Sequence, residues 1–233
     1  MANRISFLRI FRSTFNAAFR RWCIELETPI RLLRLNVRKV DVFYDAKPSF
    51  IYGDKNIGKA LLKGHFQNSE HNLDVGAQGD PWTLAVPSEQ FARWLHSFYW
   101  LNDLAVTKDK SANVRARNLV DKWIETYGKW NFFAWSPDIL SERVFNLLTV
   151  WSTLLDGDSL SKKAQIRRIS VVRQLKRLRI VYRQTSPGLH RFKAAAALAI
   201  GGAKIKEKTD AFLGLGLDWL DDEVNNQILP DGG

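Results

Sequence analysis

The stretch Trp130–Leu155, WNFFAWSPDILSERVFNLLTVWSTLL, decides how the rest of the chain is interpreted. Ser136, Pro137 and Asp138 form a typical helix start, because serine caps free amides, proline needs no amide partner there, and a carboxylate suits the positive end of the helix dipole. The apolar residues that follow recur at the helical period. They are Leu140, Val144, Leu147, Leu148, Trp151, Leu154 and Leu155. The stretch therefore predicts a helix with one buried face.

Polar side chains on the flank of this predicted helix are candidates for ligand binding. Arg143 and Asn146 lie together beside the apolar stripe, and Trp130 and Trp135 precede the helix. An arginine and an amide next to tryptophan rings are typical of a sugar-binding site. A buried helix with one arginine at its edge explains the same residues, so both interpretations stay open.

The chain from residue 88 to residue 233 is predicted to be almost entirely helical. Asp156-Gly157 and Ser186-Pro187-Gly188 interrupt the apolar periodicity and separate the helices. Helices joined by short loops predict an all-α domain, which could be a bundle, a solenoid or an (α/α) toroid. The predicted helices cover residues 88–105, 111–127, 136–155, 159–184, 189–200 and 205–228.

Residues 38–87 are predicted to be an irregular connection with short extended segments at 49–52 and 82–86, because Gly, Asp, Asn and Pro are frequent there. Within it, GDKNIGKA at Gly53–Ala60 differs by one residue from the phosphate-binding loop G-x-x-x-x-G-K-[ST]. Ala60 takes the position where a hydroxyl would bind magnesium, and no apolar strand ending in a carboxylate supplies the second metal-side element. Nucleotide hydrolysis is therefore not predicted.

Residues 1–37 form a basic amphipathic segment in which ISFLRIFRSTFNAAFRRW interleaves apolar residues with arginines. A secretory signal would need an uninterrupted apolar region, and a membrane-spanning helix would need about 20 apolar residues. Neither pattern is found, so we expect a cytoplasmic chain. The segment is expected to pack on the domain as a helix, with binding to an anionic membrane surface as the alternative.

Composition narrows the classes of partner. The net charge of +11 and the pI near 9.9 predict an acidic partner, which could be nucleic acid, an anionic membrane or an acidic polysaccharide. The single cysteine, Cys23, excludes an internal disulfide framework. The histidines are not at zinc-ligand spacing, so no metal and no cofactor are predicted. They are His65, His71, His96 and His190.

The predicted helix over residues 159–184 carries a basic outer face that contains no acid. This face supports a second function, a non-catalytic polyanion- or nucleic-acid-binding helical module that uses residues 162–183. A solvated helix face explains the same pattern, and only Tyr182 is available for base stacking. The basic residues are Lys162, Lys163, Arg167, Arg168, Arg173, Lys176, Arg177, Arg179 and Arg183.

Three segments, LHSFYWLNDL at 95–104, WSPDILSERV at 135–144 and NNQILPDGG at 225–233, resemble the N-terminal helical domain of the heparinase II/III-like family. The resemblance runs from about Gly53 to the end of the chain. It implies that residues 88–233 form an incomplete (α/α) toroid of antiparallel helix pairs, after a short irregular, β-containing connection. Complete members continue into further helices and a β-sandwich domain. They are polysaccharide lyases, which cleave uronic-acid polysaccharides by β-elimination.

The resemblance also implies where substrate would bind. In the family an Asn-Asn-His loop opens a toroid helix, and its asparagine neutralises the uronate carboxylate. Gly188-Leu189-His190 matches that loop without either asparagine, which makes His190 the candidate catalytic residue. The family's catalytic tyrosine and second histidine belong to later parts of the fold, so we predict no turnover by this chain alone. The predicted substrate contacts are Trp135, Arg143, Asn146 and Arg191.

Several expectations follow from this interpretation. The chain is the truncated or split helical part of a lyase for acidic polysaccharide, and a purely structural remnant without a ligand stays open beside it. Its partners are an acidic polysaccharide and either a missing C-terminal half or a second copy. An unclosed toroid edge around Leu213, Leu217 and Leu220 would provide that contact. No specific nucleic acid and no membrane span are expected, and the family's habit makes a periplasmic location the alternative to the cytoplasm.

Overall fold

A computed structural model describes residues 35–37, 39–44, 51–157, 159–206 and 209–227 of the chain. Residues 1–36 and 37–233 form two separate units, and all the described helices and strands belong to the second. The predicted basic segment 1–37 lies almost entirely outside the described residues. The described part is mostly helical with one small sheet, as the sequence predicts for an all-α domain.

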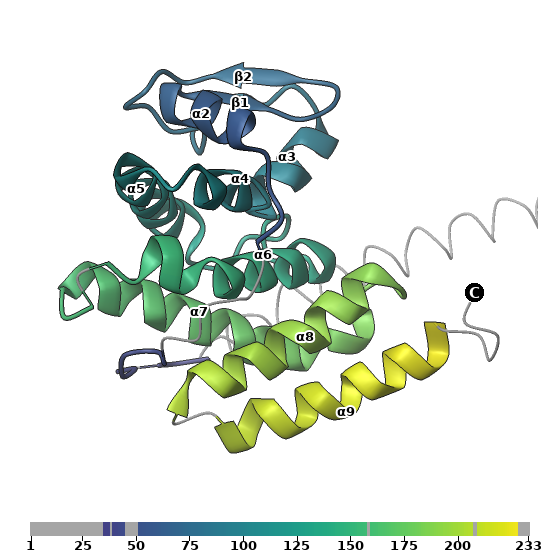
Figure 1. The fold of residues 1–233 in the computed structure, drawn as a ribbon. Coiled ribbons are helices and arrows are strands. Elements are labelled where there is room, and N and C mark those ends of the chain that lie inside the picture. The colour runs from purple at the N-terminus through teal and green to yellow at the C-terminus, as the bar shows by residue number, and fades with distance from the viewer. Residues whose placement is uncertain (1–34, 38, 45–50, 158, 207–208, 228–233) are drawn as a thin grey trace, which may run out of the picture. The chain divides into compact units, whose positions relative to one another are not determined.

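The elements follow one another in space almost as they do along the chain. Figure 1 shows them stacked from α2 and the β-hairpin, through α4 and α5, then α6 and α7, to α8 and α9. A π-helical turn, Trp151–Leu155, follows α6, and a 3₁₀ turn, Tyr182–Gln184, follows α7. The other elements are α2 (Lys55–Lys63), β1 (His65–Gln67), β2 (Asn72–Asp74), α3 (Glu89–His96), α4 (Trp100–Thr107), α5 (Lys110–Tyr127), α6 (Pro137–Thr149), α7 (Lys162–Val181), α8 (Leu189–Lys204) and α9 (Thr209–Gln227).

Helix α6 lies at the centre of this stack, in contact with α3, α4, α7 and α8. It begins at Pro137, as predicted, but the Ser136 hydroxyl makes no capping hydrogen bond. Its predicted apolar stripe is buried and continues into the π-helical turn through Trp151 and Leu155. Burial of such a stripe is the main stabilising contribution of an amphipathic helix. The central helix is therefore confirmed as the middle of the core.

The helix predicted over residues 88–105 is in fact two helices. Ser88 caps α3 through its hydroxyl, which accepts a hydrogen bond from the Phe91 amide. The chain then turns at Ser97–Tyr99, where Phe98 is buried with a positive φ of 59°. This corner between α3 and α4 redirects the chain because a left-handed residue cannot continue a helix.

Residues 38–87 contain more regular structure than predicted. The near-match to a phosphate-binding loop forms helix α2, which Asp54 caps by accepting hydrogen bonds from the Asn56 and Ile57 amides. Gly64, in the left-handed conformation, ends the helix. Because these residues form a helix from Lys55 onward, they do not form a phosphate-cradling loop.

The strands also differ from the predicted extended segments. β1 and β2 form an antiparallel hairpin in which Phe66 pairs with Leu73. Residues 82–86 are not a strand, and of the predicted segment 49–52 only residues 51 and 52 are described, also without a strand. The buried Phe66 side chain anchors the hairpin on the core.

The basic outer face predicted along residues 162–183 is interrupted in the structure. Arg167, Arg168 and Arg177 of α7 are buried. The Arg167 guanidinium is 2.9 Å from the Asp121 carboxylate of α5, and that of Arg177 lies 4.8 Å from the centre of the Trp130 ring. Three arginines of α7 therefore pack within the domain, which leaves a shorter and interrupted basic surface.

Candidate functional site

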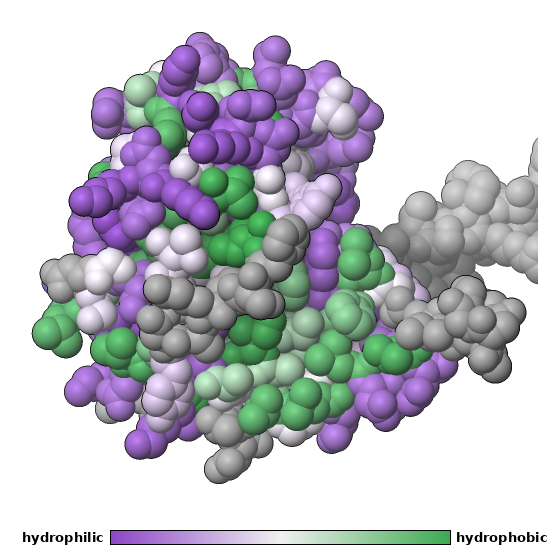
Figure 2. All heavy atoms as spheres, viewed as in Figure 1, coloured by the Kyte–Doolittle hydropathy of each residue, from purple (hydrophilic) through white to green (hydrophobic). Residues whose placement is uncertain are grey.

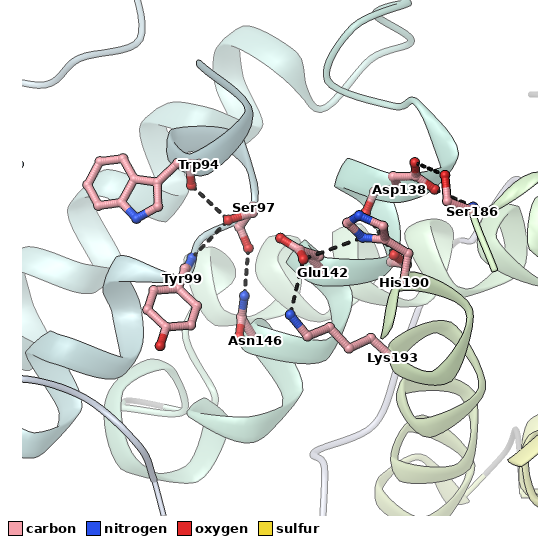
Figure 3. A network of polar contacts seen from close by, with 10 residues as sticks. Trp94, Ser97, Tyr99, Asp138, Glu142, Asn146, Ser186, His190 and Lys193 are labelled. Carbon is pink, nitrogen blue, oxygen red and sulfur yellow. Dashed lines mark hydrogen bonds and ion pairs between the residues drawn. The ribbon is translucent and has the colours of Figure 1, made fainter. Parts of the chain in front are cut away.

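A cleft of about 1130 Å³ opens among α2, the corner between α3 and α4, α6 and the start of α8. Its aromatic lining comes from Tyr52, Trp94 and Tyr99, and its amides come from Gln67, Asn68 and Gln90. Ligand sites usually have volumes of about 300–1,000 Å³, so the cleft has room for an oligomeric ligand. Figure 3 shows part of its walls, with Trp94 and Tyr99 on one side and His190 and Lys193 on the other.

Two carboxylates of α6, one helical turn apart, organise one wall of the cleft. Asp138 accepts hydrogen bonds from the Ser186 amide at 2.7 Å and the Ser186 hydroxyl at 2.6 Å. Glu142 has a carboxylate oxygen 3.0 Å from the Lys193 ammonium and 3.4 Å from Nδ1 of His190 (Figure 3). These contacts fix the start of α8 against α6 at the cleft.

His190 is the predicted site residue that lines the cleft. It lies in the first turn of α8, after Gly188, which has a φ of 85°. At 3.4 Å its Nδ1 is close to the Glu142 carboxylate without the alignment of a hydrogen bond. His190 lies at the start of a helix, as the resemblance implies. Its neighbours, however, are the Glu142 carboxylate and the Lys193 ammonium group, where the family has asparagines.

Arg143 does not reach the cleft and is instead fully buried. Its Nε donates to the Gln174 side chain at 2.7 Å, and its Nη1 donates to the carbonyls of Ala134 at 2.6 Å and His96 at 3.2 Å. The guanidinium also lies 4.3 Å from the centre of the Trp123 ring. Burial lowers the pKa of Arg143 to about 9, so it remains protonated at neutral pH. The prediction of a carboxylate-binding arginine is therefore corrected to a structural one.

Asn146 is buried as well and braces the corner between α3 and α4. Its Nδ2 donates to the Ser97 carbonyl at 2.9 Å (Figure 3). Its Oδ1 accepts a hydrogen bond from the Asn102 side chain at 3.1 Å. The Ser97 hydroxyl donates to the Trp94 carbonyl at 2.7 Å. Asn146 thus helps to position the aromatic wall from behind, and the expectation that it contacts sugar directly is not met in this structure.

The two remaining predicted contacts also lie away from the cleft. Trp135 is buried, and its indole donates to the Tyr127 carbonyl at 2.8 Å. Arg191 donates to the Thr185 carbonyl at 3.0 Å and lies 3.8 Å from the Glu223 carboxylate of α9. Both side chains hold the domain together. Of the five predicted site residues, His190 alone is among the residues that line the described cleft.

On the α2–α4 side, the cleft wall contains a buried carboxyl group. Asp103 accepts a hydrogen bond from the Asp54 amide at 2.8 Å. Burial raises the pKa of Asp103 to about 6, although the hydrogen bond from Asp54 acts in the opposite direction. Burial likewise raises the pKa of Tyr99, and the nearby Asp103 carboxyl adds to this effect. The phenol of Tyr99 is therefore held in its neutral form.

These groups are suited to binding more than to elimination chemistry. β-Elimination needs a neutralised carboxylate, a base and an acid together at one sugar. Lys193 is already paired with Glu142, and the raised pKa of Tyr99 disfavours the tyrosinate that would serve as base. Within the described ranges no cluster of three or more His, Cys, Asp or Glu side chains could hold a metal ion. None of the helices described is long and apolar enough to cross a membrane.

Comparison with known proteins yields one informative relative. The chain is 32% identical over 177 residues to FtsZ-localized protein C of Caulobacter vibrioides, a match that covers 76% of this chain and 30% of that protein. The chain therefore corresponds to less than a third of the length of this relative. Neither a model of a known protein family nor a solved structure matches the chain.

Proposed function

We propose that this chain is the N-terminal helical part of a heparinase II/III-like polysaccharide-binding protein, and that its cleft binds an oligosaccharide. The observation that carries the proposal is the lining of the cleft, where Tyr52, Trp94 and Tyr99 lie among amide and charged side chains. Aromatic rings stack on the apolar faces of sugars, and amides and carboxylates form hydrogen bonds with hydroxyls. A saccharide-binding site requires both aromatic and hydrogen-bonding side chains, and this cleft contains both.

The arrangement of the helices supports the same proposal. Helices that are near one another along the chain pack together, as an incomplete (α/α) toroid would require. The cleft lies where α6 and the start of α8 meet the corner between α3 and α4. His190 opens α8 at this cleft, the position that the resemblance to the lyases implies. The helical part would then supply a substrate-binding wall, and the complete catalytic set of a lyase would require further parts of the fold.

The binding test is a titration of the chain with defined oligosaccharides, in which tryptophan fluorescence and calorimetry measure the affinity. Trp94→Ala and Tyr52→Ala should each weaken binding at least tenfold, because they remove a stacking surface. Phe132→Ala is the matched control, since Phe132 is an exposed aromatic residue outside the cleft lining. Equal affinities in all three variants, or no binding by the unmodified chain, would refute the proposal.

A separate assay addresses turnover. We expect no unsaturated uronate product, measured by its ultraviolet absorbance, from heparin, heparan sulfate or alginate. Loss of one preorganised group typically lowers a rate by about a hundredfold to a thousandfold, and here more than one group is missing. Product that forms above background and disappears in the His190→Ala variant would show that this chain is catalytic by itself.

We also propose a second role, association with the FtsZ assembly. It is supported by the 32% identity with a protein named for its localisation with FtsZ, and the matched region includes three quarters of this chain. The test is co-sedimentation of the purified chain with assembled FtsZ, with unassembled FtsZ as the control. A chain that stays in the supernatant at every concentration would assign localisation to the part of the relative outside the match.

A further inference from the structure

We infer that the cleft binds a polysaccharide of neutral or amine-bearing sugars and discriminates against uronic-acid polymers. The inference rests on the proposed function, because it specifies the ligand of the same cleft. It departs from the acidic polysaccharide that the resemblance and the net charge of the chain both favour. The reason is that the charge of the cleft differs in sign from the charge of the whole chain.

Carboxylates outnumber cations in the lining of the cleft. The acidic side chains come from α6 on one wall and from the α2–α4 side on the other, so a bound sugar would lie between two negatively charged surfaces. The chain as a whole has a net charge of +11, but that excess lies elsewhere. The charged lining residues are Asp54, Asp103, Asp138, Glu142, Arg93 and Lys193.

Both cations of the lining already have acidic partners. The Lys193 ammonium is 3.0 Å from the Glu142 carboxylate, and the Arg93 guanidinium is 2.8 Å from the Glu89 carboxylate. A uronate that recruited Lys193 would have to displace Glu142, which would then face the new carboxylate as a like charge. Arg93 is about half exposed, so water and salt weaken its attraction for an anion. Neither cation is set up to neutralise a uronate.

The remaining polar groups match uncharged and cationic sugars. Gln67, Asn68 and Gln90 can exchange hydrogen bonds with hydroxyl and acetamido groups. Asp54 and Asp103 place two carboxyl groups on the α2–α4 side, where a sugar ammonium would find opposite charge. This wall therefore favours amine-bearing sugars over carboxylate-bearing ones.

The experiment compares three β-linked oligomers of equal length, made of glucosamine, N-acetylglucosamine and a hexuronic acid, titrated into the full 233-residue chain at pH 7.5. The glucosamine and N-acetylglucosamine oligomers should bind at least tenfold more tightly than the uronate. The difference in affinity between the glucosamine and uronate oligomers should grow as the salt concentration is lowered, because the cleft charges are then screened less. Circular dichroism and thermal melting check that each variant is folded.

Two variants and a control test the role of charge. Glu142→Gln releases Lys193, so uronate binding should strengthen while glucosamine binding weakens. Asp54→Asn keeps the helix cap of α2, since asparagine also caps, and should weaken glucosamine binding more than N-acetylglucosamine binding. Glu125→Gln removes an acid of α5 outside this cleft and should change none of the three affinities.

The outcomes distinguish the inference from the proposed function. Tightest binding of the uronate by the unmodified chain would overturn the inference and leave a saccharide-binding cleft intact. Binding of none of the three oligomers would count against the proposed function itself. If Glu142→Gln does not fold, the Asp54→Asn variant still tests the inference. Equal loss of glucosamine and N-acetylglucosamine binding in that variant would contradict a role for the charge of Asp54.

Discussion

Arg143 is a buried cation whose partners are a side-chain amide and two backbone carbonyls, with no carboxylate among them. We predict that Arg143→Ala lowers the free energy of unfolding by about 3 kcal/mol or more, because each buried group left unsatisfied costs about 1–3 kcal/mol. Arg143→Lys should also destabilise, since an ammonium cannot reproduce three directed bonds. Urea denaturation measures both changes.

Arg93→Ala is the control for this prediction. Arg93 makes an exposed ion pair with Glu89 one helical turn away, and such pairs contribute about 0.3–0.5 kcal/mol. A small effect at Arg93 beside a large one at Arg143 would separate burial from charge. Similar effects at both positions would mean that the buried network contributes little.

Asp103 should make stability depend on pH. Its pKa is about 6 in the folded chain against an ordinary value of 3.8, so between these pH values the folded state binds more protons than the unfolded state. Stability should therefore fall as the pH rises from about 4 to about 6 and should not fall further on this account above that range. Asp103→Asn should reduce this slope, which melting curves across pH would show. A slope that is unchanged in the variant would assign it to other groups.

The sequence predicts the apolar stripe of α6 correctly but not which of its flanks faces the cleft. Glu142 and Arg143 differ by one residue, which is about 100° around a helix, and that step separates a cleft side chain from a buried one. The choice depends on α3 and α8, whose residues are distant in the sequence. The sequence does contain one indication of the flank that faces the cleft. Asp138 and Glu142 are acids one turn apart on a helix with many apolar residues.

Helix α2 crosses α4 at Gly58. A side chain at this position would overlap the Asp103 carbonyl and the Thr107 side chain. We predict that Gly58→Ala destabilises the chain by about 1–3 kcal/mol, the usual range for overpacking, and weakens ligand binding because Asp54 and Asp103 shift. Chemical denaturation and oligosaccharide titration measure the two effects.

Gly214→Ala in α9 provides the matched comparison for that substitution. A side chain there would meet no atom within 4 Å. Alanine should stabilise the chain by about 0.5–1 kcal/mol, because it restricts the unfolded chain and favours the helix. If both alanines destabilise equally, the close crossing at Gly58 is not the cause.

Helix bounds could be predicted where periodicity and caps agree, and less well where long-range contacts decide. Predicted residues 111–127 agree with α5, which begins one residue earlier at Lys110 with Asp109 as its cap. The periodicity does not predict the corner at Phe98, because Ser97–Tyr99 contains neither the glycine nor the proline that usually marks a break. Helix α2 was missed because its GDKNIGKA sequence contains two glycines and resembles a loop.

Burial across the described unit depends on contacts between residues distant in the sequence, which no local pattern shows. The sequence predicts that the arginines of α7 form a basic outer face, because no acid lies among them. Asp121 of α5 and the Trp130 ring supply their partners from other parts of the chain. The fold class, in contrast, is predictable because the helices from α3 onward contribute apolar periodicity of their own.

Part of the apolar surface of α9 is exposed. α9 packs on α8 where Leu213 meets Gly202 and where Gly216 meets Ala199, and Leu220 packs against the core. Of the predicted apolar edge, this leaves Leu217, which is 52% exposed, and it forms an exposed apolar stripe with Val224, two turns further on and 38% exposed. Figure 2 shows apolar surface over this region. A stripe of this kind favours association through its apolar side chains, so we expect the purified chain to self-associate as its concentration rises.

Leu217→Asp should shift that equilibrium toward the monomer, because association would then bury a charge. Leu160→Asp is the control, since Leu160 is 89% exposed and lies outside the stripe. Sedimentation velocity across a concentration series measures both variants beside the unmodified chain. A chain that remains monomeric at high concentration would show that the exposed stripe of α9 is too small to drive association. Equal effects of the two substitutions would assign the association to general surface hydrophobicity and not to α9.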